Sequence, residues 1–284
     1  MAIFSNQATL TYNGISTNSN IAFGEILDVL AITKTPLRDN YSQGETLTYI
    51  VAMRNTSSNT LNNLTLTDDL GGYQFEGNLV YPLTYVEGSV LYYVNGVLQP
   101  SPAVTTNEPL TVTGINIPAN GDAIIVYQAT ANSFANPEIG GVITNTATVT
   151  GDALSTPIFA TAAVDAVTAA RFSISKSINP TQVVDNDRVT YTFVIQNTGN
   201  QAVVGTDNAI IRDAFNPILT ALAVEFNGTP LAEGTGYTYD EATGLFQTVI
   251  GAIEVPAATY TRDTATGEYI LTPGIATLTV TGTI

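Results

Sequence analysis

The stretch LTYIVAMRNT at residues 47–56 decides the fold of this 284-residue chain, because VTYTFVIQNT repeats it at residues 189–198. In both copies apolar, aromatic and β-branched side chains alternate with others, a pattern that favours a half-buried strand. Thr33-Lys34-Thr35 precedes the first copy, and Ser175-Lys176-Ser177 precedes the second at the same offset. The chain therefore contains two related β-rich domains.

Short strand patterns separated by turn residues fill the rest of both repeats. Asn95-Gly96 and Asn227-Gly228 are examples of these turn signals. Many short strands with such turns predict an all-β protein with two tandem β-sandwich domains. We expect an N-terminal strand at residues 1–17, a flexible joint at 18–27, a first sandwich at 28–151, a linker at 152–170 and a second sandwich at 171–284.

The two repeats end differently. The first continues into a closing strand, ITNTATVTG at 143–151, whereas the second reaches ATLTVTGTI at 276–284 without a counterpart of that strand. Residues 6–17, NQATLTYNGIST, align without gaps to residues 145–156, NTATVTGDALST. We therefore expect the second sandwich to lack its final strand and the N-terminus to carry a donor strand that can replace it. The alternative is a simple leader beside a sheet with fewer strands.

Composition excludes several classes of function. The net charge of −16 argues against nucleic acid or anionic membrane as a partner, since binding phosphate requires clustered Lys and Arg. The absence of Cys and His removes disulfides, thiol chemistry, the commonest general base and the commonest zinc ligand. Asp68-Asp69 and the Asp185-Asn186-Asp187 run lack the spaced loop of a calcium site. We expect no metal and no cofactor.

Polar side chains recur on strand faces that are otherwise apolar. The chain has two lysines, Lys34 and Lys176, and alternation places both on the apolar face of equivalent strands. Such groups are costly to bury unless they pair or react. The same alternation places four further polar residues on apolar faces: Asp68, Asp213, Asn145 and its N-terminal copy Asn6.

The run GETLTYIVAMRNTSSNTLNNLTLTDDL at 44–70, followed by ITNTATVTG, resembles the bacterial surface repeat called domain of unknown function eleven, the conserved-repeat family. That family is similar to the Ig-like modules of Gram-positive adhesins and pilins, in which a strand-borne Lys joins an Asn side chain through an isopeptide bond. The resemblance implies Ig-like sandwiches, with Lys34 bonded to Asn145 and Asp68 promoting the reaction. In the second domain it implies Lys176 and Asp213 only, because no Asn replaces Asn145.

The implied chemistry needs no histidine. A desolvated Lys favours its neutral, nucleophilic amine, and a desolvated Asp favours its protonated form. The amine attacks the Asn side-chain carbonyl, the acid polarises that carbonyl, and ammonia leaves. This is a single-turnover self-modification, so we expect the protein not to be an enzyme. The alternative is a buried Lys–Asp ion pair beside a hydrogen-bonded Asn, with no covalent bond.

We expect a structural subunit of a self-assembling extracellular fibre, either pilus-like or an appendage of a bacterial cell or spore surface. Its partners are copies of itself, joined head to tail by β-strand addition into an open filament. Asn6 of one copy would then lie beside Lys176 and Asp213 of the next. The donor strand presents these residues: Ile3, Phe4, Asn6, Ala8, Leu10 and Tyr12.

Two alternatives remain open at this stage. One is a non-polymerising surface adhesin or stalk module that binds a host or carbohydrate ligand. The other is closure of the N-terminal strand into the second domain of its own chain. No apolar run is long enough for membrane insertion, and the N-terminus shows no recognisable signal peptide.

Overall fold

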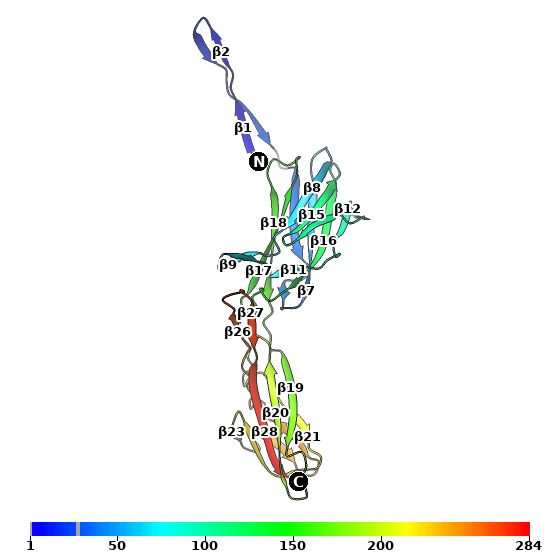
Figure 1. Cartoon of the computed structure of the whole chain (residues 1–284), viewed down its shortest axis with the longest axis vertical. Helices are drawn as coiled ribbons and strands as arrows, with labels where there is room; N and C mark the ends of the chain where they lie inside the picture. Colours follow the sequence, from blue (N-terminus) through cyan, green and yellow to red (C-terminus); the bar gives the residue numbers. More distant parts are fainter. Residues whose placement is uncertain (1, 27–28) are drawn as a thin grey trace. The chain divides into compact units, whose positions relative to one another are not determined.

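The computed structural model describes residues 2–26 and 29–284, with side chains for 4–24 and 29–284. All regular secondary structure in these residues is β-strand (Figure 1). The chain divides into two compact units, the first ending at Asp165 and the second running from Ala166 to Ile284 with the short segment Pro137–Gly141. The expectation of an all-β fold with two tandem Ig-like sandwiches is confirmed.

Unit 1 is a sandwich of two six-stranded antiparallel sheets with its core between them. The first sheet contains, in spatial order, β13 (Val97–Gln99), β12 (Leu91–Val94), β16 (Asp122–Ala131), β7 (Thr46–Asn55) and β5 (Leu30–Pro36), and β11 (Leu83–Tyr85) also pairs with β16. The second contains β14 (Ala103–Asn107), β15 (Leu110–Ile117), β8 (Leu61–Asp68), β17 (Val142–Thr150), β18 (Ile158–Ala166) and β6 (Asn40–Tyr41). A small hairpin adds β9 (Tyr73–Phe75) and β10 (Asn78–Val80).

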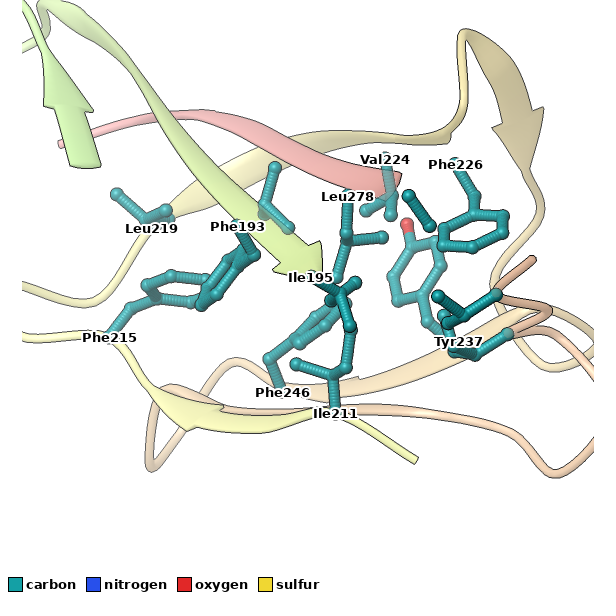
Figure 2. Packing of buried hydrophobic residues seen from close by; sticks show 14 of the residues in the cluster. Phe193, Ile195, Ile211, Phe215, Leu219, Val224, Phe226, Tyr237, Phe246 and Leu278 are labelled. Carbon is teal, nitrogen blue, oxygen red and sulfur yellow. The ribbon is translucent and has the colours of Figure 1, made fainter. Parts of the chain in front are cut away.

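Unit 2 repeats the first sheet but only half of the second. Its first sheet contains β19 (Phe172–Asn179), β20 (Arg188–Asn197), β28 (Gly274–Thr283), β22 (Thr220–Phe226) and β23 (Thr229–Leu231). Its second sheet contains β21 (Arg212–Ala214), β25 (Leu245–Thr248) and β24 (Tyr237–Asp240). A separate hairpin joins β26 (Thr259–Arg262) to β27 (Tyr269–Thr272). Figure 2 shows the aromatic core between the sheets, where Phe215, Phe246 and Leu278 lie fully buried.

Equivalent hydrogen bonds show that the two units are copies of one design. In unit 1 the buried Asn55 donates its Nδ2 to the carbonyls of Asn59 and Pro118, at 2.8 and 2.9 Å. In unit 2 the buried Asn197 donates in the same way to Gln201 and Pro256, at 2.7 and 3.0 Å. Against this background, the second sheet of unit 2 has no counterpart of β17 or β18 within the described residues.

The linker expected at 152–170 is wrong for nearly half of its length. Residues 158–166 form β18, which pairs with β17 along its whole length, from Val142↔Asp165 to Val149↔Ile158. Ala162, Val164 and Ala166 alternate as buried residues on its inner face. Alanine has a low strand preference, so this alternation of small side chains was easily mistaken for a linker.

The N-terminal segment is a hairpin rather than one strand and a joint. Its strands are β1 (Ala2–Asn6), β2 (Thr9–Tyr12), β3 (Ile15–Asn18) and β4 (Ala22–Ile26), with β1 paired to β4 and β2 to β3. Asn13 and Gly14 turn the chain with φ of 49° and 80°, as a two-residue hairpin loop requires. The flexible joint expected at 18–27 therefore contains a strand. Residues 27 and 28 lie outside the described part.

Candidate functional site

The Lys34 site lies between the two sheets of unit 1. Lys34 projects from β5 and Asp68 ends β8 of the opposite sheet, so alternation brings both side chains into the core. The Lys34 Nζ lies 2.6 Å from Asp68 Oδ2, and both side chains are fully buried. Asp68 Oδ1 also accepts a hydrogen bond from the Leu70 backbone N–H at 3.1 Å. The amine and the carboxyl group are thus held together away from water.

Asn145 joins the same site from β17, the neighbour of β8. Its register partner is Ala162, and Ala147 on the same face stands opposite Asp68. The Asn145 Nδ2 donates to the Tyr127 hydroxyl at 3.1 Å, and that hydroxyl donates to Asp68 Oδ2 at 2.6 Å. Asn145 Oδ1 is buried and accepts no hydrogen bond from the described residues. The amide carbonyl is therefore free to receive a proton donor.

Burial shifts the pKa values of this cluster. It lowers the pKa of Lys34, against the opposing attraction of Asp68. It raises the pKa of Asp68, against the opposing effects of Lys34 and the hydrogen bond from Tyr127. Both directions favour the uncharged forms, a neutral amine beside a protonated acid, which are the forms that amine attack on an amide requires.

The sequence reasoning missed two tyrosines of this site. Tyr49 and Tyr127 are register partners on β7 and β16, and their rings stack at a centroid distance of 5.5 Å. The Lys34 Nζ lies 5.0 Å from the centre of the Tyr49 ring. Burial raises the pKa of Tyr127 far above its ordinary value, so its hydroxyl remains a donor. The alternation of side chains along a strand, if applied to tyrosines as well as to charged residues, predicts that Tyr49 and Tyr127 point into the core.

The Lys176 site of unit 2 repeats the Lys–Asp contact of unit 1, but its side chains are not fully buried. Lys176 on β19 contacts Asp213 on β21 through Nζ and Oδ2, as Lys34 contacts Asp68. However, 38% of the Lys176 side chain and 19% of the Asp213 side chain are exposed. The amine also lies near three aromatic rings, at 4.4 Å from Tyr191, 5.2 Å from Phe215 and 5.4 Å from Phe193. The amine is thus positioned but open to solvent.

The apolar residues on the face of β19 that carries Lys176 are also exposed. Phe172 is 52% exposed, whereas Leu30 at the equivalent place in unit 1 is 4% exposed. Ile174 is exposed as well. On the opposite sheet β21 pairs, among the described residues, with β25 alone, whereas its counterpart β8 pairs with both β15 and β17. The open face and the unpaired edge lie where β17 and β18 lie in unit 1.

The donor-strand residues lie in the N-terminal hairpin, where Asn6 stands opposite Ala22. Their described side chains are exposed, including the apolar Phe4, Leu10 and Tyr12. The side chain of Ile3 lies outside the described part. Ala8 stands two residues beyond Asn6, where its backbone N–H donates to Ser19 Oγ at 3.0 Å. The hairpin therefore presents an uncovered apolar face that matches the residues of β17.

No protein-family model and no curated protein matches this chain. The solved structures similar to it include the major pilin BcpA of Bacillus cereus, at 10% identity and a TM-score of 0.36 over 96% of this chain and 73% of that one. A C-terminal fragment of the major pilin GBS80 of Streptococcus agalactiae matches at 16% identity and a TM-score of 0.35, over 87% and 91% of the two chains.

A family 123 glycoside hydrolase from Clostridium perfringens matches 49% of this chain at 18% identity and a TM-score of 0.30, and the chain spans 27% of that enzyme's length. Similarities this remote carry no argument about function, which has to come from the chain's own residues. In the described part of the chain no helix is long and apolar enough to cross a membrane.

Proposed function

We propose that this chain is the structural subunit of a self-assembling fibre on the surface of a bacterial cell or spore. Each copy donates its N-terminal segment to the open face of unit 2 in the next copy, and the partners are further copies of the same chain. Donor and acceptor are different surfaces, so the contact is heterologous and builds an open filament unless its rotation closes. No cofactor takes part.

One observation carries the proposal: within the described residues, unit 2 leaves open the position that β17 fills in unit 1, and the N-terminal segment repeats the sequence of β17. Unit 2 has an exposed apolar face and an unpaired β21 edge at the position of β17. Residues 6–17 repeat residues 145–156, the first half of which belongs to that strand. Exposed strand edges and apolar patches promote association with other chains, and adding a matching strand satisfies both.

In unit 1 we propose an internal isopeptide bond between Lys34 and Asn145. The neutral Lys34 amine attacks Cγ of Asn145, and Asp68 in its protonated form donates to the amide oxygen. A bond from Nζ to Cγ forms, the bond from Cγ to Nδ2 breaks, and Asp68 relays the proton that lets ammonia leave. The support is the burial of all three side chains and the contact between the amine and the acid.

At the junction between copies we propose the same reaction with Asn6. By the alignment with β17, a docked Asn6 takes the place of Asn145, beside Lys176 and Asp213 of the neighbour. Docking would also cover the open face of β19 and remove Lys176 from water. Assembly itself would then create the environment that the reaction needs.

The test is the intact mass of purified protein under fully denaturing conditions. We expect multimers whose mass falls short by one ammonia for each subunit and one more for each junction. A monomer short by a single ammonia would limit the covalent chemistry to unit 1. A monomer short by two would indicate that the N-terminal segment closes on its own unit 2, and an unmodified monomer would contradict the isopeptide chemistry in both units.

Deletion of residues 2–12 tests the assembly separately from the chemistry. We expect the truncated chain to form no fibres in electron micrographs while unit 1 still loses its ammonia. Fibres formed by the truncated chain would contradict the proposed role of the N-terminal segment. A fully monomeric full-length chain that binds a host or carbohydrate surface would favour an adhesin instead.

A further inference from the structure

We infer that the donated element is the whole hairpin of residues 2–26, so that its return strand β4 supplies a second strand to the neighbour. This inference rests on the proposed function and specifies what is donated. Unit 2 lacks counterparts of both β17 and β18 within the described residues, and a single donor strand replaces only the first. Four observations favour a two-stranded donor.

First, the hairpin reproduces the pairing of β17 with β18. Asn6 of β1 stands opposite Ala22 of β4, and Asn145 of β17 stands opposite Ala162 of β18. Aligning Asn6 with Asn145 therefore aligns two alanines across the ladder. Ala162 is buried in unit 1, which indicates the environment that Ala22 enters on docking.

Second, the neighbouring pair is complementary in size. Phe4 stands opposite Gly24 in the hairpin, where Ile143 stands opposite Val164 in unit 1, and those two are fully buried. A Cβ on Gly24 would come within 2.2–2.8 Å of the Phe4 ring, so the ring lies directly over this glycine. The hairpin thus fills with one large side chain, Phe4, the space that two side chains of medium size fill in the core of unit 1.

Third, the hairpin is well formed by local interactions. Thr9 Oγ1 donates to Asn18 Oδ1 at 2.7 Å across the ladder, and the Ser19 backbone N–H donates to the Ala8 carbonyl at 2.8 Å. The pairing shifts by one residue between Asn6↔Ala22 and Thr9↔Asn18. A donor that docked as one strand would have to lose these pairings, whereas a docked hairpin keeps them.

Fourth, unit 2 has a segment that a strand at the β18 position would reach and a strand at the β17 position would not. In unit 1 β6 is the neighbour of β18, and the Asp165 backbone N–H donates to the Asp39 carbonyl at 2.9 Å. At the same offset of the repeat, the counterparts of β6 are Gln182 and Val183, which form no strand; Val183 is 36% exposed, whereas its counterpart Tyr41 is fully buried. A donor placed only at the β17 position leaves this segment without a neighbour, and β4 at the β18 position provides one.

The test compares two arginine substitutions on β4 in the full-length chain. Ala22→Arg places a charge on the face that docks, and Phe23→Arg places the same charge on the opposite face of the strand. We expect Ala22→Arg to lower the yield of sedimentable fibres at least about tenfold relative to Phe23→Arg, because an unpaired buried charge is strongly disfavoured. Equal yields from the two variants would overturn the two-stranded donor.

Ala8→Asp separates this inference from the proposed function. Ala8 aligns with Ala147, which is fully buried on β17, so Ala8→Asp should abolish fibres whether one strand or two are donated. Fibres formed by Ala8→Asp would contradict the proposed function itself. If Ala8→Asp abolishes fibres while Ala22→Arg behaves like Phe23→Arg, donation stands and only the second strand is refuted.

Amide hydrogen exchange provides a second measurement that does not depend on a variant that fails to fold. We expect the peptide covering residues 179–184 to exchange more slowly in wild-type fibres than in Ala8→Asp monomers, because β4 pairs with it. Equal exchange in the two samples would overturn the role of β4, even if the peptide covering β21 becomes protected on assembly.

Discussion

The two lysine sites of this chain start from the same residues and differ in what covers them. Lys34 with Asp68 and Lys176 with Asp213 occupy equivalent strands and make equivalent contacts. The first pair is fully buried, and the second is partly exposed beside an open apolar face. The difference shows that the repeat places the ion pair, whereas the strands β17 and β18 provide its burial.

A second difference lies in the partners of the carboxyl group. Tyr127 donates to Asp68 in unit 1 and stands opposite Tyr49. In unit 2 the residue opposite Tyr191 is Val280, which has no hydroxyl group. The acid of the Lys176 site therefore lacks one donor that the acid of the Lys34 site has.

Removing the aspartate of each site should give the largest difference in stability between the two sites. Asp68→Ala leaves the buried Lys34 amine without its hydrogen-bond partner, and we expect unit 1 to lose about 1–3 kcal/mol of unfolding free energy, together with any covalent bond. Asp213→Ala acts on an exposed pair and should cost the isolated chain about 1 kcal/mol or less. Urea unfolding of the two variants in an Ala8→Asp background measures both effects, and equal losses would contradict the difference in burial.

The two asparagines should separate internal from intermolecular bonds. We expect Asn145→Ala to abolish the loss of ammonia from unit 1 while fibres remain covalent at their junctions. Asn6→Ala should instead give fibres that denaturant dissolves into monomers, each still short by one ammonia. Denaturing gel electrophoresis and intact mass give both readouts. Junctions that survive denaturation in Asn6→Ala would show that another residue makes them.

Chemical labelling of lysine compares the accessibility of the two sites directly, because the chain has only two lysines, one at each site. In an Asn145→Ala chain lacking residues 2–12 both amines are unbonded, and reductive methylation should modify Lys176 much faster than the fully buried Lys34. Peptide mass spectrometry gives the two rates. In assembled Asn6→Ala fibres, where no junction bond forms, we expect Lys176 to become protected as well. Rapid modification of Lys176 in those fibres would place the donor elsewhere.

The sequence predicted the repeated core of this fold because the strongest signals are long and periodic. LTYIVAMRNT forms β7 and VTYTFVIQNT forms β20, and Lys34 and Lys176 lie beside the expected aspartates. The weaker elements were missed for identifiable reasons. The alanines of β18 have little strand preference, and Asn13-Gly14 is a hairpin signal of the same kind as Asn95-Gly96 but follows a strand already assigned as a donor.

The partial exposure of Lys176 could not be predicted from alternation, which reports the face of a strand and not what covers it. Phe172 and Ile174 share that face and are exposed for the same reason. Strand parity places Tyr127 on the inner face of β16, but its contact with Asp68 depends on how β16 of one sheet packs over β8 of the other, which apolar periodicity does not determine.

The smallest expected effect concerns the Tyr127 hydroxyl. Tyr127→Phe keeps the ring stacked on Tyr49 but removes the donor to Asp68 and the acceptor for Asn145. Each hydrogen bond is worth about 1 kcal/mol, so the fold should persist while the amide is held less firmly and the bond in unit 1 forms more slowly. The fraction of monomer that has lost ammonia, followed from the time of synthesis, measures that rate.

Tyr92→Phe is the matched control, because the Tyr92 hydroxyl donates to the Asn116 carbonyl outside this cluster. If both variants form the bond at the wild-type rate, the hydroxyl is only a packing feature, and its absence from the Lys176 site has no consequence for the reaction there.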